Sequence, residues 1–202
     1  MKKIILIGAG GHSRSCIDVI EMQRKYKIIG LIDNKKKSSL NYKIIGSDNE
    51  LKKFSKKIHY ALITIGQITN SKIRENLFKK ALNCGFKFPT IISPLSYVSK
   101  HASIEEGTIV MHGSIINAGA KIGKNCIINS KSLIEHDVVI GDHCHLATRS
   151  TVSGGVTIKR NSFVGSCSVI KQNLKIGKNC FINANLFLQK DLKDNSKYYE
   201  KK

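Results

Sequence analysis

Residues 116–146 read INAGAKIGKNCIINSKSLIEHDVVIGDHCHL, and an aliphatic residue recurs at every sixth position of this stretch. The spacing continues in both directions and gives sixteen aliphatic residues at sixteen successive positions. These residues are Val98, Ile104, Val110, Ile116, Ile122, Ile128, Ile134, Ile140, Leu146, Val152, Ile158, Val164, Ile170, Ile176, Ile182 and Leu188. Because a period of six fits neither an α-helix nor a simple strand, it indicates a repeat architecture.

This period predicts a coil of three short flat faces, each of which turns one aliphatic side chain toward a common interior. The expected fold is a triangular parallel β-helix in which three six-residue steps make one full turn. The pairs Ile122–Gly123, Ile140–Gly141 and Ile176–Gly177 are separated by whole turns, so they should stack at one corner, where glycine relieves a tight turn. We assign this domain to residues 93–192.

The first 92 residues follow a different pattern, in which aliphatic strands alternate with amphipathic helices. Strands are expected at 3–7, 28–32, 60–65 and 87–92, and helices at 13–26 and 71–82. Such alternation implies a parallel sheet covered by helices. We therefore predict a small Rossmann-like domain over residues 1–92 that covers the open first end of the β-helix, and a basic tail over 193–202.

The loop after the first strand reads GAGGHS and contains Gly8, Gly10 and Gly11, and Asp33 ends the second strand. Such a loop lets phosphates approach backbone N–H groups at a helix N-terminus, and the acidic residue can hold a ribose or a base. Ser13 replaces the third glycine of a dinucleotide site. The motif favours nucleotide binding, and a generic tight turn is the alternative.

The composition narrows the functional classes. The 202 residues include 34 Lys and Arg against 14 Asp and Glu, a net charge of +20. A solvated lysine surface or nucleic-acid binding would both explain this charge, but few aromatic residues lie among the lysines for base stacking. No apolar run approaches the roughly 18–20 residues that span a bilayer. We expect neither a nucleic-acid partner nor membrane insertion.

The six cysteines include no C-x-x-C pair, which argues against a disulfide scaffold or a zinc ribbon and fits a reducing cytoplasm. Cys126, Cys144 and Cys180 share one column of the predicted coils and are expected to fill its interior. A zinc hydratase built on a β-helix would carry two histidines five residues apart, and none of the seven histidines here has that spacing. No metal is expected.

The GAGGHS loop and the stretch NSKSLIEHD, Asn129–Asp137, together resemble the bacterial sugar acyltransferases of the left-handed β-helix class. That class includes the sialic acid O-acetyltransferases, the bacillosamine-pathway N-acetyltransferase and the perosamine N-acetyltransferases. The resemblance covers residues 1 to about 192. It implies a left-handed β-helix, a homotrimer, acetyl-CoA in the cleft between neighbouring β-helices, and a nucleotide sugar held by the N-terminal domain.

The resemblance also implies roles for five residues of the β-helix. His136 matches the general base, and Asp137 matches the acidic residue that orients it. Asn129 should lie near the acceptor amine, His145 near the acetyl thioester, and Gly154 should donate its backbone N–H to the thioester oxygen.

In the first domain, His12 matches a histidine that faces the sugar and phosphates, while Asp33 and Asn34 match positions on the uracil side. Two features depart from the family. Arg149 and Ser150 stand where many members have glycine and alanine, and the chain lacks the N-P-A-K type tail that contacts CoA.

The residues themselves support acyl transfer. An amine or hydroxyl that attacks a thioester must lose a proton, and a neutral imidazole is a suitable acceptor near pH 7. Gly154 follows His136 by three six-residue steps, so one coil stacks its backbone about 5 Å from the histidine. His145 lies half a coil after His136 and should leave a different face. A buried structural histidine is the alternative for His136, and His143 is expected on the surface.

We therefore predict an acetyl-CoA-dependent N-acetyltransferase that acts on the amino group of a nucleotide-linked amino-dideoxy sugar in surface glycan biosynthesis. The alternative is O-acetylation of sialic acid or a related nonulosonic acid, because S-L-I-E-H and F-V-G-S-C, Phe163–Cys167, are at least as close to that branch. His12 favours the N-acetyl interpretation.

Overall fold

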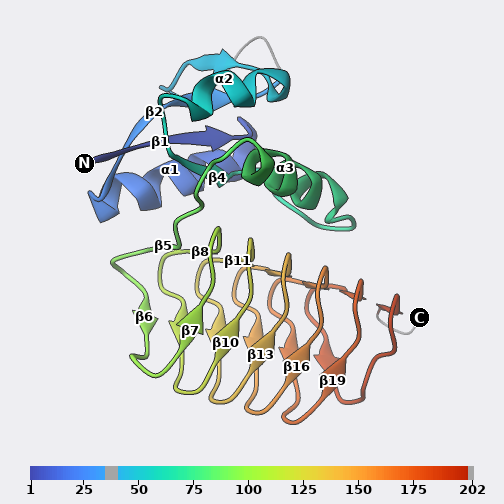
Figure 1. The fold of residues 1–202 in the computed structure, drawn as a ribbon. Coiled ribbons are helices and arrows are strands. Elements are labelled where there is room, and N and C mark those ends of the chain that lie inside the picture. Colours follow the sequence, from blue (N-terminus) through green and yellow to red (C-terminus); the bar gives the residue numbers. More distant parts are fainter. Residues whose placement is uncertain (35–40, 200–202) are drawn as a thin grey trace.

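The computed structural model describes residues 1–34 and 41–199. An N-terminal α/β domain lies along one face of a three-sided β-helix, and the last coils extend beyond it (Figure 1). The domain therefore covers a face of the β-helix and not its open first end, which corrects the expected placement. No helix in the described part of the chain is long and apolar enough to cross a membrane.

The N-terminal domain contains a four-stranded parallel sheet in the order β3-β2-β1-β4. Its elements are β1 (Lys2–Ile7), α1 (Gly11–Gln23), β2 (Tyr26–Ile32), β3 (Ile44–Gly46), η1 (Asp48–Glu50), α2 (Leu51–Ser55), β4 (Tyr60–Ile63) and α3 (Lys72–Asn83). The central strand β1 is a continuous aliphatic run because both of its faces are buried: Ile4 and Leu6 pack with α1, and Ile5 and Ile7 pack with α2 and α3.

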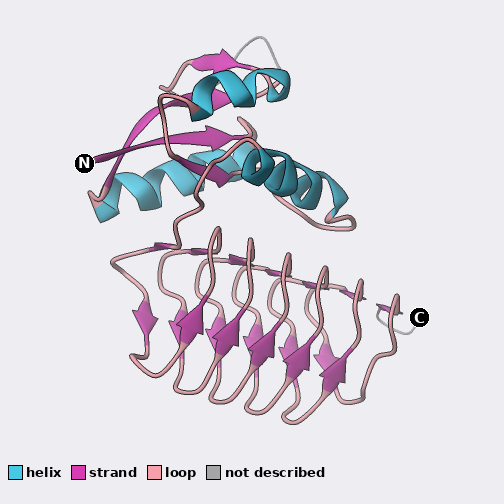
Figure 2. Ribbon diagram, in the orientation of Figure 1, coloured by secondary structure: helices cyan, strands magenta, loops and turns pink. Residues whose placement is uncertain are grey.

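The β-helix has three parallel sheets of two-residue strands (Figure 2). The domain face, which packs against the N-terminal domain, consists of β5 (Ile91–Ile92), β8 (Ile109–Val110), β11 (Ile127–Ile128), β14 (His145–Leu146), β17 (Phe163–Val164), β20 (Phe181–Ile182) and β22 (Lys197–Tyr198). The second face consists of β6 (Tyr97–Val98), β9 (Ile115–Ile116), β12 (Leu133–Ile134), β15 (Thr151–Val152), β18 (Val169–Ile170) and β21 (Phe187–Leu188). The third face consists of β7 (Ser103–Ile104), β10 (Lys121–Ile122), β13 (Val139–Ile140), β16 (Thr157–Ile158) and β19 (Lys175–Ile176).

The register confirms that three six-residue steps make one coil, because Ile122 pairs with both Ile104 and Ile140. The six-residue row of aliphatic side chains lines the interior, together with the buried cysteines of the predicted column. Glycine is required at the corners by close approach, since a Cβ on Gly141 would lie 2.7 Å from the backbone nitrogen of Arg160 in the next coil. The fold class predicted from the period is confirmed.

Three boundaries differ from the sequence expectations. The strand expected at 87–92 is reduced to a bridge between Lys87 and Tyr60 and to β5, which pairs with β8 and so already belongs to the first coil. Residues 44–55 contribute β3, η1 and α2, for which no pattern was recognised. Residues 193–199 continue the coils, because β22 pairs with β20, although the step from Phe181 to Lys197 is shorter than a full coil and breaks the six-residue period.

The two domains are joined by an apolar contact with polar bonds at its edges. Ile91, Ile109 and Ile127 on the domain face are fully buried against the α1 side of the N-terminal sheet. At one edge, His112 Nε2 lies 2.8 Å from Asp18 Oδ2 on α1. Together, the apolar contact and the polar bonds hold α1, and with it the glycine loop at its start, in a fixed position on the β-helix.

Candidate active site

His136 and Asp137 form a pair at the corner between the second and third faces. His136 Nδ1 lies 2.9 Å from Asp137 Oδ2, and both side chains are exposed in the single chain. If Nδ1 donates to the carboxylate, the lone pair of the imidazole is on Nε2. The aspartate adopts a positive φ of 59°, and Lys131 and His143 at the neighbouring corners of the coil also have a positive φ.

Two glycines make room for this pair. A Cβ on Gly154 would lie 2.6 Å from His136 Nε2, so the ring lies directly against the backbone of the next coil. Gly119, one coil earlier, lies under Asp137, whose Oδ1 occupies the space that a side chain there would need. Gly119 was not recognised from the sequence, although its position one full coil before Asp137 in the repeat could have indicated it.

His145 and Asn129 lie on the domain side of the β-helix, away from the His136 corner. His145 is 7% exposed on β14 and its Nδ1 donates to the carbonyl oxygen of Gln67. Its Nε2 accepts a bond of 3.2 Å from Asn129 Nδ2, and Asn129 Oδ1 accepts from Ser130 N. Burial is the main cause that lowers the pKa of His145 to about 4, so the ring is neutral near pH 7.

The three predicted glycines of the loop have different roles. Gly8 is buried with φ +116°, and a Cβ there would lie 2.5 Å from Ile65 Cγ1, so the fold itself requires glycine. At Gly10 and Gly11 a Cβ would meet no atom within 4 Å. The space above them is therefore open, and it lies at the N-terminus of α1, where no side chain caps the helix and the first turn contains no acidic residue.

Asp33 and Asn34 lie beside this loop. Asp33 Oδ2 accepts a bond of 2.7 Å from the backbone nitrogen of Ala9, so the carboxylate holds the loop in place. Asn34 is exposed, and its Nδ2 donates to Asp48 Oδ2 over 3.2 Å.

His12 lies in the first turn of α1, directly after the glycine loop. Its Nε2 lies 3.4 Å from Cys16 Sγ. Burial, followed by the charges of Arg74 and His145, lowers the pKa of His12 to about 3. His12 and His145 are thus near enough for their charges to interact, whereas the His136 pair lies at the corner between the second and third faces.

The sequence did not indicate the polar junction beneath His12. It consists of Arg74, Gln67, Asn125 and His143, which come from the N-terminal domain and from a corner of the β-helix. The prediction that His143 is a surface residue is wrong: it is 5% exposed and packs edge-on against Phe78 of α3. These side chains are buried because the two domains pack together, and no local sequence pattern predicts that packing.

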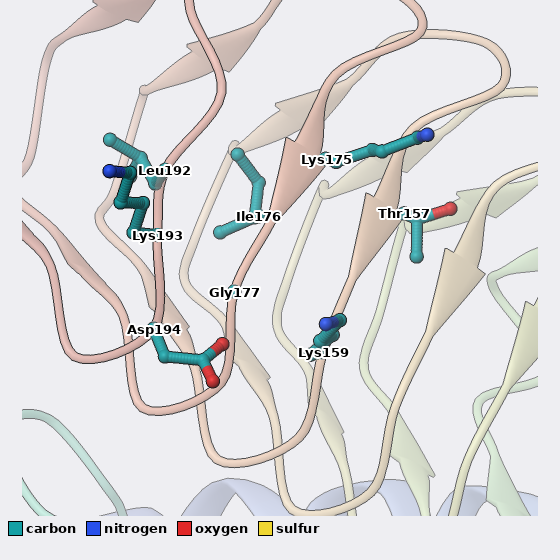
Figure 3. A pocket seen from close by; sticks show the side chains of 8 residues that line it. All are labelled: Thr157, Lys159, Lys175, Ile176, Gly177, Leu192, Lys193 and Asp194. Atoms are coloured by element: carbon teal, nitrogen blue, oxygen red, sulfur yellow. The ribbon is translucent and has the colours of Figure 1, made fainter.

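Two cavities lie near the C-terminal coils. A pocket of 220 Å³ on the third face contains none of the predicted site residues (Figure 3). A larger cleft of 450 Å³ lies between the segment 68–72 and the domain face. Phe163 on its wall packs edge-on against His145 at 5.2 Å, so this cleft adjoins the domain-side residues. Within residues 1–34 and 41–199, no three His, Cys, Asp or Glu side chains are grouped as metal ligands.

This architecture, with a histidine–carboxylate pair at a coil corner and a glycine-loop domain on one face, defines the class of left-handed β-helix acyltransferases. Residues 3–81 match the family described as PglD N-terminal domain, and residues 110–199 match the GMPPB C-terminal domain family. The UDP-N-acetylbacillosamine N-acetyltransferase of Bacillus subtilis (strain 168) is 31% identical over 113 residues. That match spans 55% of this chain and 52% of the relative, about half of its length.

Two solved structures are similar over nearly the whole chain. The acetyltransferase domain of PglB from Neisseria gonorrhoeae FA1090, in complex with acetyl coenzyme A, has a TM-score of 0.90 and 26% identity, covering 97% of this chain and 95% of that one. PerB from Caulobacter crescentus, in complex with CoA and GDP-perosamine, has a TM-score of 0.89 and 27% identity, covering 96% and 92%. These similarities confirm the resemblance, seen in the sequence, to the bacterial sugar acyltransferases of this class.

Proposed function

We propose that the protein transfers the acetyl group of acetyl-CoA to the amino group of a nucleotide-linked amino-dideoxy sugar, in surface glycan biosynthesis. The observation that carries this proposal is the His136–Asp137 pair lying against Gly154. The similar structures support it, because one holds acetyl coenzyme A and another holds CoA with GDP-perosamine.

The residues at the His136 corner can perform the transfer. The sugar amine attacks the thioester carbonyl while His136 Nε2 takes its proton, and Asp137 stabilises the imidazolium through Nδ1. The N–H of Gly154 donates to the oxygen that becomes negative. When the carbon–sulfur bond breaks, the proton on Nε2 passes to the departing CoA thiolate, which returns the imidazole to its neutral form.

The N-terminal domain would hold the nucleotide. The open space over Gly10 and Gly11 at the uncapped N-terminus of α1 suits a diphosphate. His12 would face the sugar and phosphates, while Asp33 and Asn34 would lie toward the base. Asp33 would also act indirectly, because its carboxylate accepts a hydrogen bond from the backbone nitrogen of Ala9 and so holds the loop in place.

The active unit would be a homotrimer. The outward column of the second face includes Tyr97, Ile115, Val169 and Phe187, which are between 37% and 59% exposed. Burial of such a column against another copy would stabilise a ring of subunits. His136 lies at the edge of this face with 67% of its side chain exposed, so a neighbouring copy would also enclose the catalytic pair.

The substrate class can be tested directly. Purified protein is incubated with acetyl-CoA and UDP-, dTDP- and GDP-amino sugars, or with free and CMP-linked nonulosonic acids, and released CoA thiol is measured. We expect release with a nucleotide amino sugar and its loss in His136→Ala. Release with nonulosonic acids alone would replace N-acetylation with O-acetylation, and no release with any acceptor would contradict the proposal.

A further inference from the structure

Arg74 of α3 is a charged side chain buried at the junction of the two domains, with 1% exposure. Its Nη1 donates to the carbonyl oxygens of Ile63 and Ile65, and its Nη2 donates to the carbonyl oxygen and Oδ1 of Asn125 at 3.1 and 2.8 Å. These four acceptors are neutral oxygens. A buried cation is costly unless it is well bonded, so this arrangement indicates a specific role.

The two bonds of Arg74 Nη1 connect the guanidinium to the glycine loop through the end of β4. Ile63 and Ile65 flank Thr64 at the end of β4, and Thr64 Oγ1 donates to the carbonyl oxygen of Gly8 over 2.7 Å. Gly8 in turn packs against Ile65 without room for a side chain. The position of the β4 end therefore sets the position of the loop that precedes His12.

The two bonds of Arg74 Nη2, both to Asn125, connect the guanidinium to His145. Asn125 Nδ2 lies 3.0 Å from His143 Nδ1, and Gln67 Nε2 donates to the carbonyl oxygen of His143 over 2.9 Å. The carbonyl oxygen of the same Gln67 accepts from His145 Nδ1. A continuous series of hydrogen bonds thus links Arg74 to the imidazole of His145 through the β-helix corner.

We propose that Arg74 is a positioning residue that holds the Gly8–His12 loop and the His145–Asn129 pair at one fixed spacing. This inference rests on the proposed function, in which the loop holds the nucleotide sugar, and on the roles that the sequence resemblance implies for Asn129 near the acceptor amine and for His145 near the acetyl thioester. Arg74 is too deeply buried to touch a substrate and acts through the backbone of β4 and through Asn125.

The electrostatics agree with this placement. Besides each other and the ring of Phe163, the groups that act on the two imidazoles are Cys16, Gln67, Asn129 and Arg74, and of these Arg74 is charged at neutral pH. Its charge lowers the pKa of both His12 and His145, in addition to the larger effect of burial. Each ring is consequently neutral near pH 7, with one protonated and one unprotonated nitrogen.

Four variants separate geometry from charge. Arg74→Lys keeps the charge with fewer donors, and Arg74→Met removes both. Asn125→Asp keeps an acceptor oxygen for Arg74 but adds a carboxylate that neutralises its charge. Arg160→Met is the matched control, because Arg160 bonds Glu75 across the same junction but is 49% exposed.

Two readouts are used: the kinetics with acetyl-CoA and the amino sugar, and the ¹⁵N shifts of the imidazoles against pH. We expect Arg74→Met to lower kcat by about 10²-fold and to raise KM for the sugar, since small misplacements have effects of that order. Arg74→Lys should lie between Arg74→Met and the parent, and Arg160→Met should match the parent. In Asn125→Asp, His12 and His145 should titrate at higher pH.

The inference is overturned if folded Arg74 and Asn125 variants keep the parent kcat, KM and imidazole shifts. Should Arg74→Met fail to fold, Arg74→Lys and Asn125→Asp still decide between these outcomes. Absence of acetyl transfer by the parent protein would contradict the proposed function alone, because the imidazole shifts test Arg74 without any turnover.

Discussion

Gly154 lies against the imidazole of His136, one coil further along the β-helix, so that a Cβ there would lie 2.6 Å from Nε2. The contact joins the proposed base to the backbone that would receive the oxyanion. Because the coils stack about 5 Å apart, the six-residue repeat itself sets this spacing.

Gly154→Ala should therefore lower kcat without unfolding the protein. The backbone of Gly154 does not have a positive φ, so alanine is tolerated there, but its methyl group must displace the His136 ring. We expect a loss of about 10²-fold, as for a small misplacement of a catalytic group. Unchanged thermal melting serves as the control for folding, and parent-like turnover would show that the ring position is not critical.

His136→Ala should lower kcat by about 10²–10⁴-fold, the usual share of a general base. Asp137→Asn should cost less, since it preserves a partner for Nδ1 but removes the charge that stabilises the imidazolium. Both are measured at saturating sugar with melting curves compared. Near-normal turnover by folded His136→Ala would exclude it as the base.

Substitution of Gly10 by leucine should raise the KM for the nucleotide sugar and leave the KM for acetyl-CoA nearly unchanged. A Cβ at Gly10 would meet no protein atom within 4 Å, so the leucine side chain would extend from there into the open space above α1. Separate titration of the two substrates provides the measurement. An equal loss of acetyl-CoA affinity would assign this space to CoA instead.

The sequence predicts those features that depend on a local repeat, and it does not predict those that depend on contacts between distant segments of the chain. The aliphatic row from Val98 to Leu188 is a regular six-residue repeat. The period alone therefore predicted the coils and placed Gly154 one coil after His136, against its ring. Tyr198 closes the last described coil with an aromatic side chain after a shortened step, and the repeat therefore did not reveal it. The bonds from Arg74 to Asn125, and those that Gln67 makes with His143 and His145, form only when the domains dock, and no local sequence pattern indicates them.

The free energy of unfolding should decrease as the pH falls from about 7 toward 4. The folded-state pKa values of His12 and His145 are about 3 and about 4, below the roughly 6.5 of an unfolded chain. The unfolded state therefore binds protons first on acidification, and each unit of difference contributes on the order of 1.4 kcal/mol. Urea titrations at several pH values measure the slope, which His145→Gln should reduce. An identical slope in that variant would contradict the lowered pKa.

Mixed trimers should recover activity that neither parent variant has. His136 lies at the corner between the second and third faces, whereas His145 lies on the domain face, so one subunit directs the two rings away from a common point. In a ring of subunits, the corner of one copy can meet the domain side of the next. On this view His136→Ala and His145→Ala each have strongly reduced activity.

Mixing the two variants after reversible dissociation should create some clefts that receive a normal His136 from one subunit and a normal His145 from the next. Subunit exchange is verified by mass differences between tagged chains, and CoA release is compared with that of the unmixed variants. Recovered turnover would show that each active site contains His136 from one subunit and His145 from the next. Verified exchange without any recovery would place all catalytic groups of a site in one subunit, or would show that His145 is dispensable.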